Sequence, residues 1–120
     1  MRHTYEFRLY PNKQQERSLL RTLDACRHLY NAMLWQRQMA YERRVRLSRF
    51  DQEKQLPALR AEDPEFGTVY AHLLQDVARR LDLAFSAFFR RCKAGEAPGY
   101  PRFKGREHYN SLTFKEAANG

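Results

Sequence analysis

The feature that most constrains the fold is an apolar stripe that runs from Thr68 to Cys92. Its apolar residues recur at alternating steps of three and four, which is the period of one face of an α-helix. Gly95 follows the stripe and is typical of a helix C-terminus. The pattern predicts one long helix over about 68–94, which would span roughly 37 Å and form the spine of a single domain. The stripe comprises Val69, Leu73, Leu74, Val77, Leu81, Ala84, Phe85, Phe88 and Cys92.

The first residues predict a strand that leads into a helix. Residues 4–10 alternate between apolar and polar side chains, as a half-buried strand requires, and Pro11 ends the alternation. Asn12, with Gln15 three residues later, is typical of a helix N-terminus. The helix that follows is expected to bury Leu19, Leu20 and Leu23.

Two interpretations of the next segment stay open. Asp24 can cap a second helix, which would give a helix-turn-helix-like pair, or a single helix can continue through this position. The segment ends in a basic run that either frays in solvent or contacts phosphate. This run comprises Arg43, Arg44, Arg46 and Arg49.

The remaining segments complete the expected fold. Residues 51–60 predict a short helix capped by Asp51, and residues 61–67 indicate an acidic surface loop. Residues 99–103 and 108–114 have the aromatic, Ser and Thr content of short strands. The expected fold class is therefore α+β and mostly α, with helices inserted between an N-terminal strand and C-terminal strands of one sheet.

The balance of charge favours a polyanionic partner. The chain has 22 Lys and Arg against 14 Asp and Glu, a net charge of +8. The alternative is that this charge serves solubility alone. We find no apolar run long enough to cross a membrane and no signal-peptide core at the N-terminus, so we expect a cytoplasmic protein without a membrane partner.

The sequence lacks the signatures of common enzymes. It has no nucleophile-elbow, zinc-protease or phosphate-loop motif, and its acids are scattered. Cys26 and Cys92 share no ligand spacing with any histidine, so both are expected to be buried thiols. His28 is interpreted as a satisfied or half-exposed histidine rather than as a general base. We therefore expect no catalytic residues, no metal, no other cofactor and no small-molecule substrate for this chain.

Two sets of residues point to nucleic-acid binding. In the first, between residues 99 and 111, rings can stack on unpaired bases while cations neutralise phosphates. Alternatively, these rings pack on the helices and the cations point to water. In the second set, Arg27 and Asn31 lie four apart beside Tyr30 and suit base edges, although Asn31 can equally make a local hydrogen bond. The first set comprises Tyr100, Arg102, Phe103, Lys104, Arg106 and Tyr109.

Four segments resemble, in order and spacing, the N-terminal part of the TnpB family: YEFRLYPNKQQ, CRHLYN, HLLQDVARRLDLAFSAFFRR and GYPRFKGREHYNS. These insertion-sequence-encoded proteins, long described as transposases with a helix-turn-helix, are similar to compact type V CRISPR effectors. The resemblance covers essentially the whole chain. It implies an RNA-guided DNA endonuclease in which a helical bundle is inserted into a wedge β-barrel. Residues 1–10 and 97–120 would form a partial, incomplete wedge, residues 11–96 the helical recognition lobe, and residues 1–46 the helix-turn-helix region.

The resemblance also implies partners and binding residues. Guide RNA and target DNA are the implied partners, and Gln75 is implied to face the duplex, where it can read a base edge. Ser111–Lys115 resembles the wedge segment near the target-adjacent motif. The family's RuvC-like carboxylate core and zinc ribbon are absent from the sequence, so divalent metal and zinc are expected only in a missing C-terminal part. The positions that match the family's motifs are Arg8, Tyr10, Pro11, Arg27, Tyr30, Asn31, Gln75, Pro101, Arg102 and Phe103.

The resulting expectation is a nucleic-acid-binding N-terminal module of a TnpB-like nuclease, either a fragment or the product of a decayed gene, that does not cut DNA by itself. Two alternatives remain: a basic helical interaction or structural module, and a free-standing helix-turn-helix DNA-binding protein.

Overall fold

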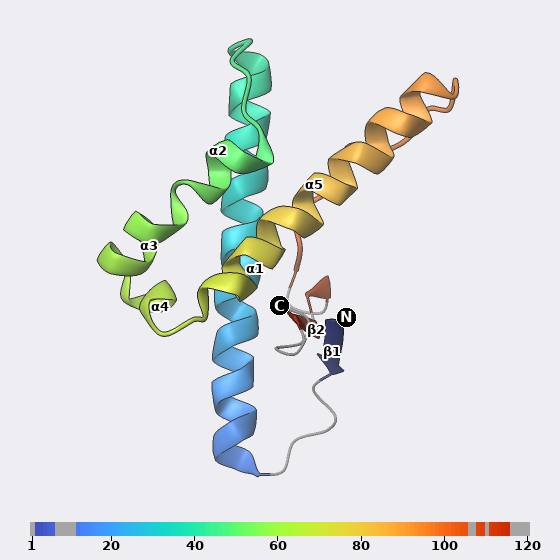
Figure 1. Ribbon diagram of the computed structural model, residues 1–120. Helices are drawn as coiled ribbons and strands as arrows, with labels where there is room; N and C mark the ends of the chain where they lie inside the picture. Colours follow the sequence, from blue (N-terminus) through green and yellow to red (C-terminus); the bar gives the residue numbers. More distant parts are fainter. Residues whose placement is uncertain (1, 7–11, 106–107, 110, 116–120) are drawn as a thin grey trace.

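The computed structural model describes residues 2–6, 12–105, 108–109 and 111–115 (Figure 1). Helices make up most of this part of the chain: α1 (Lys13–Glu42), α2 (Arg49–Glu53), α3 (Leu56–Glu62), α4 (Pro64–Gly67) and α5 (Ala71–Lys93). Two short strands, β1 (Arg2–Glu6) and β2 (Ser111–Lys115), pair with each other, and β2 lies against α5.

The core lies where α5 crosses α1 (Figure 1). The apolar stripe of α5 is directed toward α1, and Leu74, Val77 and Leu81 are completely buried. On α1, Leu34 is completely buried as well. Since burying a leucine or valine side chain contributes roughly 1.5–3 kcal/mol, these side chains are a main source of stability. Helix α5 lies within the range 68–94 that the stripe predicts.

The stripe leaves the core before its C-terminal end, because α5 diverges from α1 there (Figure 1). Cys92 is exposed, so the prediction of two buried thiols is wrong for this residue. Cys26 is buried, and its burial raises the pKa of its thiol to about 12. The Cys26 thiol therefore stays protonated at neutral pH and behaves as a small apolar side chain.

The helix α1 is continuous, which decides between the two interpretations of residues 12–46. It begins after Asn12, whose side-chain oxygen accepts a hydrogen bond from the Gln15 amide at 2.9 Å, as the capping pattern predicts. It then passes through Leu23 and Asp24 without a turn. Asp24 caps no second helix; its carboxylate lies 3.6 Å from Arg27 within α1.

The short helices α2, α3 and α4 connect the two long ones. Ser48, rather than Asp51, caps α2, and Asp51 completes the reciprocal capping box. Hydrogen bonds from Ser48 lower the pKa of the Asp51 carboxyl. The single helix predicted over 51–60 is thus replaced by α2 and α3. The predicted acidic loop contains α4, which buries Phe66 against the core.

The predicted fold class is wrong in its β part. The body is helical, and the described residues form no wedge barrel: their one ladder pairs β1 with β2 antiparallel, with Arg2 opposite Lys115 and Glu6 opposite Ser111. Residues 99–103, predicted as a strand, are coil. Pro98 and Pro101 carry no amide hydrogen for a ladder, which disfavours pairing in this segment. Of the predicted strand at 4–10, residues 7–10 lie outside the described residues.

Within the described ranges, no helix combines the length and apolar character that crossing a lipid bilayer requires.

Candidate nucleic-acid interface

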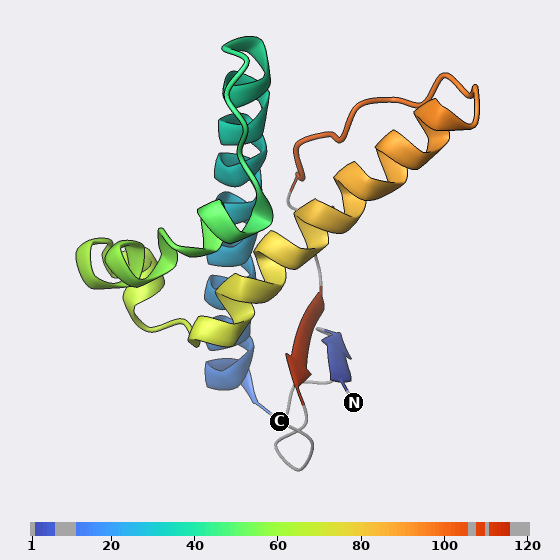
Figure 2. The ribbon, with the colours of Figure 1, turned by 45° about the horizontal axis from the view of Figure 1, so that its top comes forward.

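The two long helices separate beyond their crossing and leave an open angle (Figures 1 and 2). Two connecting segments run back from the ends of these helices. Residues 43–48 descend beside α1, and residues 94–105 return from the tip of α5 toward the crossing (Figure 2). We call the region bounded by the C-terminal halves of α1 and α5 and by these two segments the fork.

Both segments turn back through a backbone conformation of the left-handed region. Arg44 has φ 58° just after α1, and Gly95 has φ 80° just after α5. Glycine adopts this conformation without steric cost, whereas arginine adopts it rarely. The turn at Arg44 directs residues 45–48 back along α1 (Figure 1).

An aromatic cluster forms the base of the fork. Phe85 and Phe88 of α5 meet the ring of Tyr100 edge-on, with centroids 5.4 and 5.2 Å apart. Phe89 extends the cluster, with its ring 5.4 Å from that of Phe88, and is half exposed. Burial raises the pKa of the Tyr100 hydroxyl, and the neighbouring Tyr41 raises it further. Tyr41 and Tyr100 line the same pocket, although they come from different sides of the fork.

Arg37 joins the helices at the crossing. Its guanidinium donates to Gln52 at 2.9 Å and to Asp82 of α5 at 3.1 Å, and it lies 4.9 Å from the centre of the Phe85 ring. Gln52 is completely buried and donates in turn to the carbonyl of Met33 at 2.8 Å. This network ties α1, α2 and α5 together, since every buried polar group in it needs its partner.

Asn31 anchors the returning segment. Its amide nitrogen donates to the Lys104 carbonyl at 2.9 Å, and its oxygen accepts from the Lys104 amide at 2.7 Å. The ammonium group of Lys104 lies 5.6 Å from the centre of the Tyr30 ring. Because both ends of the Asn31 side chain are engaged, the local hydrogen bond is the interpretation that the structure supports, rather than contact with a base edge.

Replacing Asn31 by alanine is expected to loosen residues 99–105 more than it destabilises the whole fold. The variant loses two partly buried hydrogen bonds, so the free energy of unfolding should fall by about 0.5–1.5 kcal/mol. Hydrogen exchange should show faster exchange of the Lys104 amide. Replacing the nearby exposed Ala32 by serine provides a control, and unchanged exchange at Lys104 in the Asn31 variant would contradict this anchoring role.

A second anchor holds Tyr109 beside β2. Its ring is buried, lies 6.0 Å from that of Tyr30 and lies under the guanidinium of Arg80 at 5.0 Å. Arg80 also donates to the carbonyl of Ser111 at 3.0 Å. Burial raises the pKa of Tyr109 well above its usual range. Arg79 and Arg80 are both paired with Asp76, which makes these two cations part of the scaffold.

The predicted binding residues fall into separate places. Tyr30 and Tyr109 are buried, so neither ring is available to stack on a base. Arg27 is largely covered and lies within 3.1 Å of His28. Arg8 and Arg106 lie outside the described residues. The exposed predicted residues are Gln75 near the start of α5, and Arg102 and Phe103 in the returning segment. Tyr100 and Lys104 are partly buried in the fork.

The fork gathers more cations than the predicted binding set contains. Exposed arginines and a lysine lie at the ends of both long helices and on both returning segments, and no ion pair is found for them among the described residues. The acids in the same segments are Glu42 and Glu96. The sequence showed these cations as separate runs, and only the fold brings them to one end of the molecule. They are Arg43, Arg44, Arg46, Arg90, Arg91, Lys93 and Arg102.

Tyr41 and Phe89 were not predicted as candidate binding residues. Their exposure distinguishes them from the core aromatics: 75% for Tyr41 and 50% for Phe89. The available sequence signal is weak. Phe89 follows Phe88 directly and so falls off the apolar stripe, and Tyr41 lies next to a run of charged residues.

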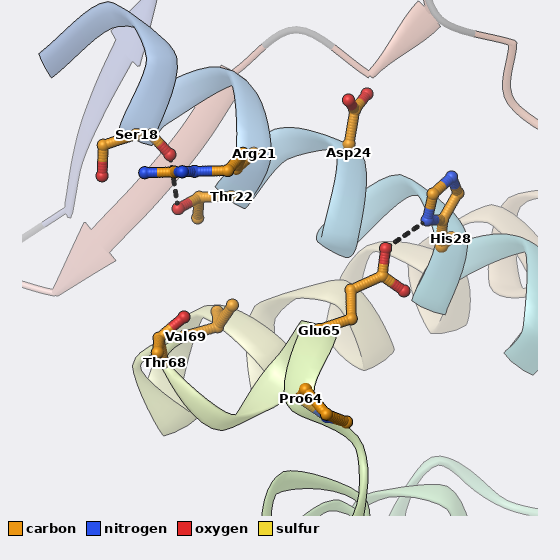
Figure 3. A pocket seen from close by; sticks show the side chains of 9 residues that line it. All are labelled: Ser18, Arg21, Thr22, Asp24, His28, Pro64, Glu65, Thr68 and Val69. Atoms are coloured by element: carbon orange, nitrogen blue, oxygen red, sulfur yellow. Dashed lines mark hydrogen bonds and ion pairs between the residues drawn. The ribbon is translucent and has the colours of Figure 1, made fainter. Parts of the chain in front are cut away.

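A different pocket, of about 640 Å³, lies between the N-terminal half of α1 and α4 (Figure 3). His28 and Glu65 face each other across it, with a ring nitrogen and a carboxylate oxygen 2.6 Å apart. Arg21 and Asp24 line the same pocket, so it favours neither sign of charge. The His28–Glu65 contact ties α4 to α1. The His28 side chain is both partnered and 48% exposed, which agrees with the interpretation of a satisfied or half-exposed histidine.

The described residues contain no group of three or more His, Cys, Asp or Glu side chains placed to hold a metal ion.

Comparison with known proteins bears on the start of the chain. Residues 1–46 match the family HTH_OrfB_IS605, described as a helix-turn-helix domain. No curated protein and no solved structure matches the chain. The match supports the resemblance to the N-terminal helix-turn-helix region of TnpB/IS605 OrfB transposases over these residues. The helical part of that segment described here is the single helix α1.

Proposed function

We propose that this chain is the nucleic-acid-binding N-terminal module of a TnpB-like, transposon-encoded, RNA-guided DNA endonuclease. The fork holds the sugar–phosphate backbone of guide RNA or target DNA, and the chain alone binds without cutting. Phosphate contacts supply most of the affinity, while the exposed Gln75 reads a base edge of the duplex.

One observation carries this proposal: exposed cations from segments far apart in the sequence lie at the C-terminal ends of the two long helices and on the segments that follow them. Arg43, Arg44 and Arg46 follow directly after α1, and Arg90, Arg91 and Lys93 lie in the last turn of α5. A phosphate backbone that follows the fork can meet both groups, and each neutralised phosphate releases counterions. Charge that served solubility alone would not need to gather at one end of the molecule.

The proposal predicts that removing the cations on one side of the fork weakens binding and its salt dependence. In the triple variant Arg43→Gln, Arg44→Gln, Arg46→Gln, affinity for a short DNA duplex should fall about tenfold to a hundredfold at low salt. The slope of log affinity against log salt should flatten by about 0.9 for each phosphate that the variant no longer neutralises. Fluorescence anisotropy at several salt concentrations measures both quantities, and the same titration with an RNA hairpin tests the RNA partner.

A variant with the same reduction of charge elsewhere provides the control. Lys13, Arg17 and Arg21 are exposed on the N-terminal half of α1, outside the fork. Replacing these three by glutamine should cost much less affinity. Equal decreases in affinity for the two triple variants would contradict a localised site, and affinity that is independent of salt for both DNA and RNA would contradict the proposed function as a whole.

A further inference from the structure

The fork contains a pocket of about 310 Å³ between its two sides. Tyr41, Val45 and Arg46 line it from α1 and the segment that follows α1. Phe89 and Tyr100 line it from α5 and the returning segment. This volume is at the lower end of the range of roughly 300–1,000 Å³ in which proteins bind small ligands.

The rings of this pocket are unusually accessible. The Tyr41 side chain is 75% exposed and that of Phe89 is 50% exposed, whereas Phe85 directly below is 4% exposed. The cluster with Phe85, Phe88 and Tyr100 holds Phe89 in place, with ring centroids about 5–6 Å apart. Phe89, which other rings support, and the exposed ring of Tyr41 line the same pocket and form a surface on which another flat ring can stack.

The charge around the pocket indicates what the stacked ring belongs to. Arg46 is part of the pocket wall and is exposed, and no ion pair is found for it in the described part of the chain. Arg43 and Arg44 precede it on the same segment. An apolar protein segment would pack against the rings but would place no negative charge near these cations. A nucleic-acid strand offers flat bases that can stack on the rings and phosphates that can pair with the cations.

From these observations we propose that the fork pocket takes up an unpaired base of single-stranded DNA or RNA. The base stacks on Tyr41 and Phe89, and the adjoining phosphate meets Arg46. This inference depends on the proposed function, because it requires the fork to hold a nucleic-acid backbone. It adds a preference for unpaired over fully paired nucleic acid, which backbone contact alone does not provide.

The test compares one DNA strand, carrying 2-aminopurine in its middle, with the duplex it forms with its complement. Since stacking changes 2-aminopurine fluorescence, the wild-type chain should change the signal of the single strand and bind it more tightly than the duplex. Tyr41→Ala should weaken single-strand binding about 5-fold to 150-fold, the effect of removing one base–aromatic stack, and should leave duplex binding within about twofold. Tyr41→Phe should retain single-strand binding, because the ring remains.

Exposed rings elsewhere provide matched controls. Phe50 of α2 is 68% exposed and Tyr70, before α5, is 67% exposed, and neither lines this pocket. Their alanine variants should bind the single strand like the wild type. Equal weakening of single strand and duplex by Tyr41→Ala, or no weakening of either, would overturn the base pocket while salt-dependent duplex binding still supports the proposed function. If the DNA strand, the DNA duplex and the RNA hairpin all fail to bind, both proposals fail.

Self-association is a separate outcome of the same design. Sedimentation of the wild type and Tyr41→Ala would reveal a dimer that depends on this ring. Such a dimer, together with no preference for single strands, would show that a second copy of the chain occupies the pocket and would overturn the inference.

Discussion

Leu81→Ala is expected to lower the free energy of unfolding by about 2–5 kcal/mol, the largest effect we predict for a single substitution. Leu81 is completely buried on the face of α5 that crosses α1. The substitution removes apolar packing and leaves a cavity at the crossing, which neighbouring side chains fill only in part. Because the free energy of unfolding of a small domain is roughly 5–15 kcal/mol, this decrease is a large fraction of the total stability. Urea denaturation followed by circular dichroism measures it.

The control for this prediction is Leu83→Ala, two residues further along the same helix. Leu83 is 53% exposed, so its replacement changes little buried area and slightly favours the helix. We expect a change within about 0.5 kcal/mol. A similar decrease in both variants would show that α5 does not pack on α1 through the face described.

The second large effect is expected for Arg37→Ala, at about 1–3 kcal/mol. The variant leaves the completely buried Gln52 without its donor and removes the cation over the Phe85 ring. Most of the cost comes from the unsatisfied Gln52 oxygen, because burial prevents water from replacing the missing hydrogen bond. Asp82 contributes less, since its side chain is 39% exposed and water can solvate it.

Two further variants test this explanation. Arg37→Met keeps most of the apolar stem, so a destabilisation close to that of Arg37→Ala assigns the effect to the missing hydrogen bonds. Arg43→Ala removes an exposed arginine from the end of the same helix and should cost less than about 0.5 kcal/mol. If the Arg37 and Arg43 variants are equally destabilised, the buried network at the crossing is not a source of stability. Urea denaturation of all three variants gives the comparison.

Several features were correctly predicted because they depend on neighbours in the sequence. The stripe around Leu74 and Leu81 repeats with the helical period, so it indicates both the helix and its buried face. The cap at Asn12 involves atoms only three residues apart. The resemblance to the transposase helix-turn-helix region also follows from sequence alone, and the family match supports it over residues 1–46.

Other features were left open or wrongly predicted because distant contacts decided them. No local pattern distinguishes a second helix capped by Asp24 from the continuous α1, and packing against α5 stabilises the continuous form. The aromatic content of residues 99–103 suggested a strand, but Tyr100 packs against Phe85 and Phe88 instead. A wedge barrel needs further paired strands, and the described residues provide a single two-stranded ladder.

By itself, the sequence determined the long helix α5, the cap that opens α1, the excess of positive charge and the resemblance to the transposase helix-turn-helix region. These properties are local or additive, so neighbouring residues suffice to specify them. Only the tertiary structure decided which rings and cations remain accessible. The packing of α5 on α1 buries Tyr30 and Tyr109. It also brings Asn31 to Lys104, 73 positions further along the chain. Tyr41 and Phe89 remain exposed in the fork. Burial depends on the packing of whole helices, which no residue type specifies alone.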